Sequence, residues 1–467
     1  MDSIMTLRQI ADHIGGTLEN CMDETVVCDV VTDSRKTAPG SVFVALRGDK
    51  FDGHNFVNQV TSLGAVCSVV DKDFENTENA PVMVVEDTRS ALLAIAKFYR
   101  SLFNIPAIAI TGSVGKTSTK DMVSQVLMEH YNVLKTEGNF NNEIGLPLTV
   151  FRMCEENQLA VFEMGMSAFG EISRLTSVAM PETAILTNIG YSHIEHLGSR
   201  ENILKAKLEI LEGLSPDGTV VICGDDEYLW NAKEQIPFET MTYGIENIDC
   251  DITAENVEKS ENGTRFDVTV DGEVYTVELA VPGVHHVYNA LAAIITGYLY
   301  SVPMDEIIAG VEKFKPSGMR QNITELSDKV IIKDCYNASP TSMKSGLEVL
   351  TVTKPKDGSA ESRKVAVLGD MLELGDFAKD AHFDVGKLCS EYMVDCLVAI
   401  GPNAKYVAEG AIAGGFSSPE LYVFHDNTSA IEHISEIIRP NDVILFKGSR
   451  GMRLEEVADY IAENDVK

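Results

Sequence analysis

The stretch AIAITGSVGKTSTKDMV, residues 107–123, decides the fold that the sequence predicts. Its first four residues are apolar and predict a buried strand, and a loop of small and polar residues follows them. Beyond the loop, apolar residues recur at helical spacing: Met122, Val123, Val126 and Leu127. A strand that turns through a glycine-containing loop into a helix is the setting of a phosphate-binding loop, so this stretch predicts an α/β domain.

The loop has the residue types that phosphate binding requires. Glycines let backbone N–H groups turn toward an anion, and the helix N-terminus adds partial positive charge. Lys116 would reach the terminal phosphates, and the Thr117 hydroxyl could ligate magnesium. The usual pattern GxxxxGK[ST] begins with glycine where this chain has Ile110, so the loop is a shortened form, and a plain strand-to-helix turn is the alternative interpretation. The residues expected at a nucleotide are Thr111, Gly112, Ser113, Val114, Gly115, Lys116, Thr117 and Ser118.

Composition limits the class of protein. A chain of 467 residues is too long to fold around a single hydrophobic core, so two to four domains are predicted. There are 38 Lys and Arg against 71 Asp and Glu, and this net charge of −33 argues against nucleic acid or an anionic membrane as a partner. The N-terminal residues do not resemble a secretory signal, and the longest apolar run, 290–302, is shorter than the roughly 20 residues that span a bilayer. We therefore expect a cytoplasmic protein, and a monomer. Its nine cysteines form no CxxC pair and predict neither a zinc site nor disulfides.

Three domains are predicted, with boundaries at 1–86, 87–316 and 317–467. The first has short apolar runs separated by turn residues, which indicates a small α/β domain. The second repeats strand, turn and amphipathic helix, which indicates a doubly wound parallel sheet; alternation within 251–281 predicts an antiparallel addition to it. The third has five strand and helix units and is predicted to be Rossmann-like. It has no GxGxxG motif, so dinucleotide binding is not supported there.

Two polar residues follow other strands of the second domain. Glu163 comes directly after the predicted strand 159–162, and His193 lies four residues after the predicted strand 183–189. The carboxyl ends of parallel strands meet at one edge of a sheet, so both are expected beside the phosphate loop. Each alone is more often an ordinary surface or satisfied polar residue. Their shared position with Thr117 predicts a magnesium site.

Lys207 lies on the apolar face of a predicted helix that Ser199 can cap. It is four residues from both Ile203 and Leu211, so it is either buried or a stem that carries its charge to the surface. Burial would lower its pKa and yield a neutral amine that can react with carbon dioxide. The resulting carbamate could hold a second magnesium. Lys205, on another face, is the weaker candidate.

Taken together, these residues resemble the Mur ligase family, the ATP-dependent enzymes that build the peptide of bacterial cell wall precursors. The resemblance covers essentially the whole chain. It is carried by TGSVGKTST, by Glu163 and His193 with HIEHLGS and KAKLEIL, and by PGVHHVYNALAA at 282–293. Further stretches indicate the members that join D-alanyl-D-alanine to UDP-N-acetylmuramoyl-tripeptide: 33–56, 138–149, 334–343, 368–375 and 446–457.

The resemblance implies roles for individual residues. Ser34 and Arg35 would lie near the uridine diphosphate, and Asn139, Asn141 and Asn142 would face the sugar-peptide. Asn289 would contact adenine, and Arg320 would approach the nucleotide after domain closure. Lys207 would be carbamylated, and magnesium would be held by Thr117, Glu163, His193 and the Lys207 carbamate. In the third domain, matching residues would help to bind ATP and the dipeptide: Asp334, Tyr336, Asn337, Lys447 and Arg450.

Two departures from the family pattern bear on these roles. His286 stands where the family commonly has asparagine, which leaves the adenine contact to Asn289. Around Asp334 the chain has Lys333 and Cys335, and Ser339 replaces an asparagine.

The implied activity is an ATP-dependent ligation in peptidoglycan precursor synthesis, and through it a role in cell wall biogenesis, cell shape, cell division and the cell cycle. The tripeptide carboxylate would attack the γ-phosphate of ATP, and the dipeptide amine would attack the resulting acyl phosphate. Two alternatives are a folylpolyglutamate synthetase-like ligase and a P-loop NTPase that acts as a switch. The first-domain DSR stretch and GNFNNEIG at 138–145 argue against the former. Joint placement of Lys116, Glu163, His193 and Lys207 argues against a purely structural protein.

Overall fold

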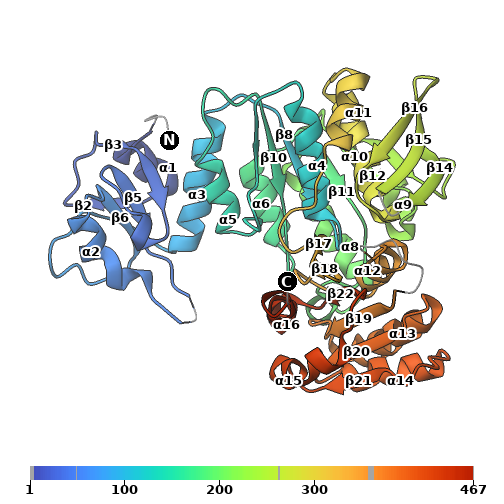
Figure 1. Cartoon of the computed structure of the whole chain (residues 1–467). Helices are drawn as coiled ribbons and strands as arrows, with labels where there is room; N and C mark the ends of the chain where they lie inside the picture. Colours follow the sequence, from blue (N-terminus) through green and yellow to red (C-terminus); the bar gives the residue numbers. More distant parts are fainter. Residues whose placement is uncertain (1–4, 49, 261–262, 356–361, 466–467) are drawn as a thin grey trace.

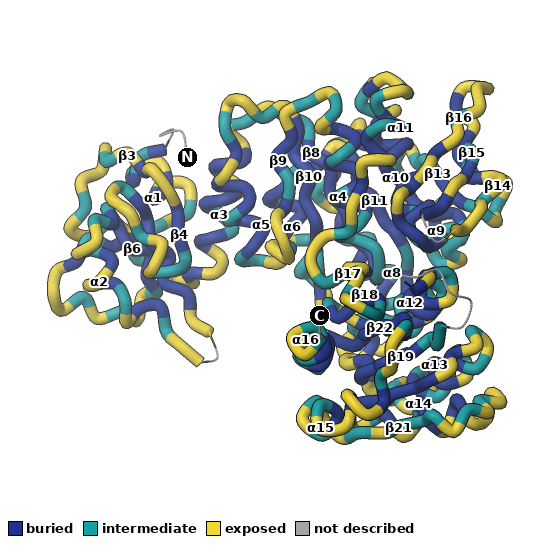
Figure 2. The backbone as a smooth tube through the Cα atoms, viewed as in Figure 1, coloured by how far each residue is buried: buried dark blue, intermediate teal, exposed yellow. Residues whose placement is uncertain are grey.

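The computed structural model describes residues 5–48, 50–260, 263–355 and 362–465, which form three lobes (Figure 1). Each lobe is built on its own main sheet. The strands in the middle of each main sheet are buried, whereas several edge strands and many loops are exposed (Figure 2). The α/β fold class with three main sheets confirms the prediction from sequence, whereas the boundaries at 86/87 and 316/317 stay predictions.

The first lobe has a five-stranded sheet in the order β2-β7-β6-β5-β4, in which only the β2–β7 pair is antiparallel. A short antiparallel pair, β1–β3, lies beside it. Its strands are β1 (Met5–Thr6), β2 (Thr17–Glu19), β3 (Val26–Val27), β4 (Asp29–Val31), β5 (Ser41–Val44), β6 (Cys67–Asp71) and β7 (Val82–Val85). Its helices are α1 (Leu7–Ile14) and α2 (Val57–Ser62).

Helix α3 (Thr88–Ser101) lies between the first lobe and the central sheet (Figure 1). The Asp87 side chain caps it by accepting from the N–H of Ser90. Near its other end the buried Arg100 donates to three carbonyl oxygens: Ala179 at 3.0 Å, Phe103 at 2.8 Å and Ile105 at 2.8 Å. Because a buried guanidinium with satisfied donors is costly to displace, α3 is tied to the central lobe.

The central lobe has a nine-stranded sheet in the order β16-β15-β14-β13-β12-β11-β8-β10-β9. Strands β8 to β14 are parallel, and β15 and β16 add antiparallel pairs, as the alternation predicted. The strands are β8 (Ala107–Thr111), β9 (Val133–Lys135), β10 (Leu159–Glu163), β11 (Thr183–Leu186), β12 (Thr219–Cys223), β13 (Glu239–Gly244), β14 (Ile252–Ser260), β15 (Gly263–Val270) and β16 (Glu273–Leu279). The helices are α4 (Lys116–Met128), α5 (Gly145–Val150), α6 (Glu171–Ala179), α7 (Ile194–Leu197), α8 (Arg200–Leu208), α9 (Glu227–Ala232), α10 (Val284–Leu299) and α11 (Met304–Glu312).

The strand order reverses at β8. The chain runs from β8 outward to β9, returns to β10 between them, and then crosses to β11 on the other side of β8. In open α/β sheets, ligands bind in the crevice beyond the carboxyl ends of strands at such a reversal. The topology therefore directs attention to the residues that follow β8, β10 and β11.

The third lobe has a six-stranded sheet in the order β17-β18-β22-β19-β20-β21, with only the β17–β18 pair antiparallel. Its strands are β17 (Asn322–Glu325), β18 (Val330–Asp334), β19 (Lys364–Gly369), β20 (Cys396–Ile400), β21 (Leu421–Phe424) and β22 (Val443–Lys447). Its helices are α12 (Pro340–Val352), α13 (Ala378–Glu391), α14 (Ala404–Ala413), α15 (Asn427–Ile437) and α16 (Glu455–Glu463).

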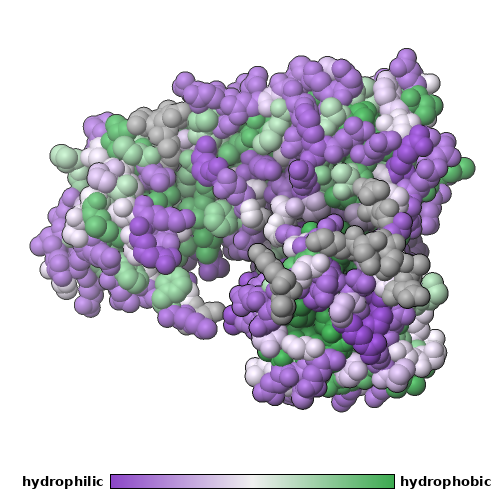
Figure 3. Space-filling model, in the orientation of Figure 1, coloured by the Kyte–Doolittle hydropathy of each residue, from purple (hydrophilic) through white to green (hydrophobic). Residues whose placement is uncertain are grey.

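The visible surface is mostly hydrophilic, with apolar side chains in small separate areas (Figure 3). This agrees with a chain of net charge −33 that keeps its apolar residues in cores. Within the described ranges, none of the helices is both long and apolar enough to cross a membrane.

Candidate functional site

A cavity of about 920 Å³, here called the main cavity, lies at the carboxyl edge of β8, β10 and β11. Its walls come from the central and third lobes. The phosphate loop, Glu163 and Asn289 contribute from one side, and Asn337 and Lys447 contribute from the other. The structure thus brings together predicted site residues that are more than 300 positions apart in the chain.

The loop after β8 has the backbone shape that its glycines permit. Gly112 has φ 155° and Gly115 has φ 87°. A Cβ on Gly112 would lie 1.9 Å from the Thr187 hydroxyl oxygen, so a side chain at position 112 would displace the strand-end segment beside it. Both glycines are therefore required by geometry.

Asn188, which follows β11, supports the loop from the side. Its Oδ1 accepts from the N–H of Val114 at 2.9 Å, and its Nδ2 donates to the Val114 carbonyl at 2.9 Å. Its own carbonyl accepts from the Ser113 N–H at 3.0 Å. Sequence reasoning treated Asn188 as part of a strand and missed this role; its position in TAILTNI, beside the phosphate loop, was the available signal.

Lys116 begins α4, and its ammonium points back over the loop. Its Nζ donates to the Gly112 carbonyl at 2.7 Å and to the Ser113 carbonyl at 3.4 Å. Burial lowers the pKa of Lys116, the nearby Glu163 raises it, and Arg320 lowers it further. An ammonium held over backbone carbonyls in a partly dry site exerts a strong field on any phosphate placed there.

Glu163 is the last residue of β10 and is 1% exposed. Its Oε2 accepts from the Thr117 hydroxyl at 2.8 Å, and its Oε1 accepts from Nδ2 of Asn141 at 2.7 Å. These two contacts bring together three residues that were predicted separately. Carboxylate and hydroxyl oxygens are ligands that Mg²⁺ prefers, so Glu163 and Thr117 suit a magnesium ion beside the loop.

His193 also lines the main cavity but contacts the third lobe. It precedes α7 with φ 65°, and its Nδ1 forms an ion pair with Oε2 of Glu373 at 2.5 Å. Glu373 also accepts, through its carbonyl, from the N–H of Glu195 at 3.2 Å. The contact with His193 holds the pKa of the Glu373 carboxyl below its ordinary value. Across the described ranges, no group of three His, Cys, Asp or Glu side chains is placed to hold a metal ion.

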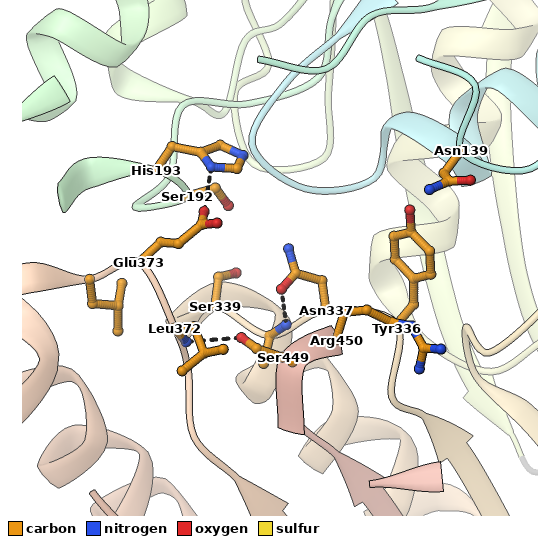
Figure 4. Close-up of a pocket in the computed structure, with 13 residues that line it drawn as sticks. Asn139, Ser192, His193, Tyr336, Asn337, Ser339, Leu372, Glu373, Ser449 and Arg450 are labelled. Carbon is orange, nitrogen blue, oxygen red and sulfur yellow. Dashed lines mark hydrogen bonds and ion pairs between the residues drawn. The ribbon is translucent and has the colours of Figure 1, made fainter. Parts of the chain in front are cut away.

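Figure 4 shows a second, smaller cavity of about 240 Å³, here called the side cavity, in which His193 and Glu373 point toward one another. Asn139, Tyr336, Asn337 and Arg450 also line it. The Arg450 guanidinium is paired with Glu455, and the Asn337 side chain accepts from the N–H of Ala338 at 2.8 Å. Glu373 was not predicted as a site residue, although it lies in LGDMLELG.

Lys207 is 1% exposed on α8, beside the fully buried Ile203. Burial, and then the positive charge of Lys116, lower its pKa well below the ordinary value of 10.5. Of the two alternatives that the sequence left open, a buried side chain and a stem that carries its charge to the surface, the structure shows the buried side chain.

The other predicted residues fall in three places. Asn289, 6% exposed on α10, accepts at Oδ1 from the Thr119 hydroxyl at 2.9 Å. Lys447 ends β22, and its Nζ donates to Oδ2 of Asp334 at 2.5 Å in a buried ion pair. Arg320 lies over the Tyr336 ring, with its Cζ 3.7 Å from the ring centroid.

The first-lobe residues lie outside both cavities. Ser34 and Arg35 are in a short 3₁₀ helix, and Arg35 pairs with Asp33 at 2.7 Å. That contact lowers the pKa of Asp33 to about 2.

Asn142 of the central lobe lines the main cavity, and its Oδ1 accepts from the N–H groups of Ile144 and Gly145.

Three family models match this chain along most of its length. The Mur ligase family catalytic domain matches residues 28–100, the Mur ligase middle domain matches 110–297, and the Mur ligase glutamate ligase domain matches 319–450.

Curated relatives match from end to end. A UDP-N-acetylmuramoyl-tripeptide--D-alanyl-D-alanine ligase of Bacillus subtilis strain 168 is 40% identical over 98% of this chain and 98% of its own length. An Escherichia coli K12 protein of the same name is 32% identical over 98% and 99%.

Solved structures show the same architecture. MurF from Acinetobacter baumannii superposes with a TM-score of 0.89 at 30% identity, covering 98% of this chain and 99% of that one. MurF ligase from Thermotoga maritima in complex with ADP has a TM-score of 0.82 at 27% identity, covering 93% and 97%.

Substitution of Lys207 by methionine tests its burial as a neutral amine. Between the lowered pKa of the folded protein and 10.5, only the unfolded chain binds the proton, so wild-type stability rises with pH by about 1.4 kcal/mol per pH unit. Lys207→Met lacks this dependence. Its stability advantage over wild type is therefore expected to be largest below this window and to vanish as pH approaches 10.5.

Urea denaturation at a series of pH values, in buffers freed of carbon dioxide, measures this difference. The exposed Lys205→Met is the matched control and should stay within about 0.5 kcal/mol of wild type. A Lys207→Met advantage that does not change with pH would show that Lys207 is charged in the folded protein throughout.

Proposed function

Since this chain belongs to the Mur ligase family, we propose that it joins D-alanyl-D-alanine to UDP-N-acetylmuramoyl-tripeptide, with hydrolysis of ATP to ADP and phosphate, in peptidoglycan precursor synthesis. The observation that carries the proposal is the main cavity. It combines a braced phosphate loop, a buried carboxylate and cationic residues of the third lobe in one space.

Amide formation from a carboxylate and an amine needs an activated acid, and ATP provides it. The terminal carboxylate of the tripeptide attacks the γ-phosphorus of ATP; the bond to the β,γ-bridging oxygen breaks, and ADP leaves. The product is an acyl phosphate. The amine of D-alanyl-D-alanine then attacks the acyl carbon, and the tetrahedral intermediate expels phosphate as the amine loses its proton.

The residues of the phosphate loop serve the first step. The backbone from Thr111 to Ser118 would surround the β- and γ-phosphates, and Lys116 would compensate the charge of the transferring group. Asn289 lines the main cavity on the same side as the loop, bonded to Thr119 of α4, and would contact the adenine ring there. Arg320 and Asn337 also line this cavity and would complete the nucleotide site.

Magnesium fits the oxygen ligands beside the loop. Thr117 and Glu163 are in contact and would hold one ion, with His193 joining when it leaves Glu373. A bound divalent ion neutralises the triphosphate and orients its γ-phosphoryl group. Asn141 keeps the Glu163 carboxylate turned toward Thr117 through its hydrogen bond.

Lys207 would hold a second ion as a carbamate. Its neutral amine adds to the carbon of carbon dioxide and loses a proton, which gives an anionic group and removes the repulsion by Lys116. Nuclear magnetic resonance of protein equilibrated with ¹³C-bicarbonate is expected to show a carbamate carbon in the wild type but not in Lys207→Met. Identical spectra of the two proteins would show that Lys207 does not carry a carbamate.

The peptide substrates would meet the nucleotide between the lobes. The first lobe would hold the UDP-sugar through Ser34 and Arg35, and Asn139, Asn141 and Asn142 would face the sugar-peptide. Lys447 and Arg450, with Asp334 and Tyr336 beside them, would receive the dipeptide from the third lobe. Closure of the lobes would exclude water, because an exposed acyl phosphate hydrolyses.

The activity would place the protein in the cytoplasm as a monomer that binds neither nucleic acid nor membrane. Its net charge of −33 supports the absence of nucleic acid partners. Through cell wall biogenesis, the activity would contribute to cell shape, cell division and the cell cycle.

Phosphate release tests the ligation directly. We expect release from ATP only when both UDP-N-acetylmuramoyl-tripeptide and D-alanyl-D-alanine are present, and a loss in kcat/KM of about 100-fold or more in Lys116→Ala. The exposed Lys97→Ala on α3 is the control and should match wild type. Equal release without the dipeptide would instead support an NTPase switch.

Glu163→Gln tests the magnesium site. The amide keeps the shape of the side chain but removes its charge, so we expect the Mg²⁺ concentration that gives half-maximal rate to rise by about tenfold or more. Glu171→Gln, an acidic side chain that lines the same cavity at the start of α6, is the matched control. An unchanged Mg²⁺ requirement in Glu163→Gln would place the metal elsewhere.

A further inference from the structure

The segment that joins the central and third lobes, residues 313–321 and here called the linker, carries Arg320. It begins where α11 ends and runs to the start of β17. Two of its residues have left-handed backbone conformations, Gly318 with φ 65° and Gln321 with φ 45°. The second is not a glycine, so surrounding contacts must hold it in that conformation.

The middle of the linker is fixed to α4. The Ser317 hydroxyl donates to Oδ2 of Asp121 at 2.7 Å. The other oxygen of that carboxylate pairs with Nζ of Lys120 at 2.8 Å and with Nζ of Lys135 at 3.1 Å. Because Asp121 is itself held by two cations, Ser317 contacts a rigid part of the central lobe.

His286 on α10 fixes the end of the linker. Its Nε2 donates to Oε1 of Gln321 at 2.6 Å, and both side chains are buried, at 2% and 8% exposure. The imidazole also packs against Phe314, with ring centroids 5.5 Å apart. One histidine thus contacts the linker at two residues. Burial and the neighbouring His285 lower the pKa of His286 well below 6.5, which keeps the ring neutral and its Nε2–H in place as the donor.

Arg320 lies between these fixed points and faces the main cavity. Its guanidinium lies over the ring of Tyr336, and its charge is near enough to Lys116 to lower the pKa of that lysine. Two cations that face one cavity repel each other, so contacts must hold Arg320 there. The Tyr336 ring is one such contact, and the fixed segment that carries Arg320 provides the others.

We propose that His286 is a positioning residue: through its hydrogen bond to Gln321 it fixes the linker, so that Arg320 is presented to the nucleotide phosphates before the third lobe moves. The inference rests on the proposed function in one respect, that Arg320 contacts the nucleotide. It differs from the expectation that Arg320 approaches the nucleotide after domain closure, because the linker is already fixed to the central lobe on both sides of Arg320, at Ser317 and at Gln321.

A double-mutant cycle on nucleotide binding tests the proposal. The probe is the non-hydrolysable ATP analogue adenylyl imidodiphosphate with Mg²⁺, titrated by calorimetry into the full chain without either peptide substrate. We expect Arg320→Ala to weaken binding by about tenfold or more and His286→Leu by about three- to tenfold. The double variant should bind no more weakly than Arg320→Ala alone, because His286 acts only through Arg320.

Gln321→Ala provides a second way to break the contact if His286→Leu does not fold, and the same lack of additivity with Arg320→Ala is expected. The control is His130→Leu, which removes a partly exposed histidine that pairs with Glu306 away from the linker. It should bind like wild type.

The contrary outcomes are distinct. The positioning role is overturned if the double variant binds more weakly than Arg320→Ala by the full factor that His286→Leu or Gln321→Ala causes alone. It is also overturned if His286→Leu and Gln321→Ala each bind the analogue like wild type. In both cases the proposed function stands. If Arg320→Ala binds like wild type, the premise that Arg320 contacts the nucleotide fails, and the inference with it. If wild type does not bind the analogue, the proposed function itself fails.

Discussion

The whole site depends on one electrostatic arrangement: the buried carboxylate of Glu163 lies near the half-buried Lys116, whose ammonium is held over the phosphate loop at the carboxyl edge of the central sheet. Neither charge is matched by a direct ion pair with the other. Glu163 is held by the Thr117 hydroxyl and the Asn141 amide, and Lys116 is held by loop carbonyls. Removing a carboxylate and an ammonium from water without an ion pair is unfavourable. A metal-bound triphosphate between them would offset this cost, because its metal ion attracts the carboxylate and its phosphate oxygens attract the ammonium.

The same constraint explains the position of Lys207. A further buried cation near Lys116 would be unfavourable, and burial together with the charge of Lys116 lowers the pKa of Lys207 well below its ordinary value. A lysine side chain would attract a metal ion only after a reaction, such as carbamate formation, that makes it anionic. Loop, carboxylate and lysine are on different elements, and the strand reversal at β8 is what brings them together.

Contacts between lobes place the remaining groups. His193 is held by Glu373 of the third lobe, and Arg320 lies over Tyr336, so residues expected at the nucleotide already have partners across the lobe boundary. The first-lobe residues Ser34 and Arg35 line neither cavity. A substrate whose UDP-sugar is held by the first lobe would therefore have to extend its peptide across the space between the lobes to the nucleotide. Asn139 and Asn141 would contact it along that path.

Much of this could be predicted from the sequence, because local patterns determine it. The apolar run 107–110 predicted β8, the helical spacing of apolar residues from Met122 to Leu127 predicted α4, and the alternation within 251–281 predicted β14 to β16. The helical position of Lys207 predicted either a buried side chain or a stem that carries its charge to the surface, and the structure shows the buried side chain. The contacts of Glu373 and Gln321 could not be predicted, since each depends on how separate elements pack in three dimensions rather than on any periodicity. For Asn188 the sequence offered a position at a strand end but no sign of its bonds to the loop.

The central claim is that the cavity transfers the γ-phosphoryl group of ATP to a peptide carboxylate. It is tested most directly with UDP-N-acetylmuramoyl-tripeptide labelled with ¹⁸O in its terminal carboxylate. Because the attacking carboxylate oxygen stays on phosphorus when the amide forms, one ¹⁸O is expected in the phosphate released with D-alanyl-D-alanine. Phosphate without label, at full ligation, would contradict the account.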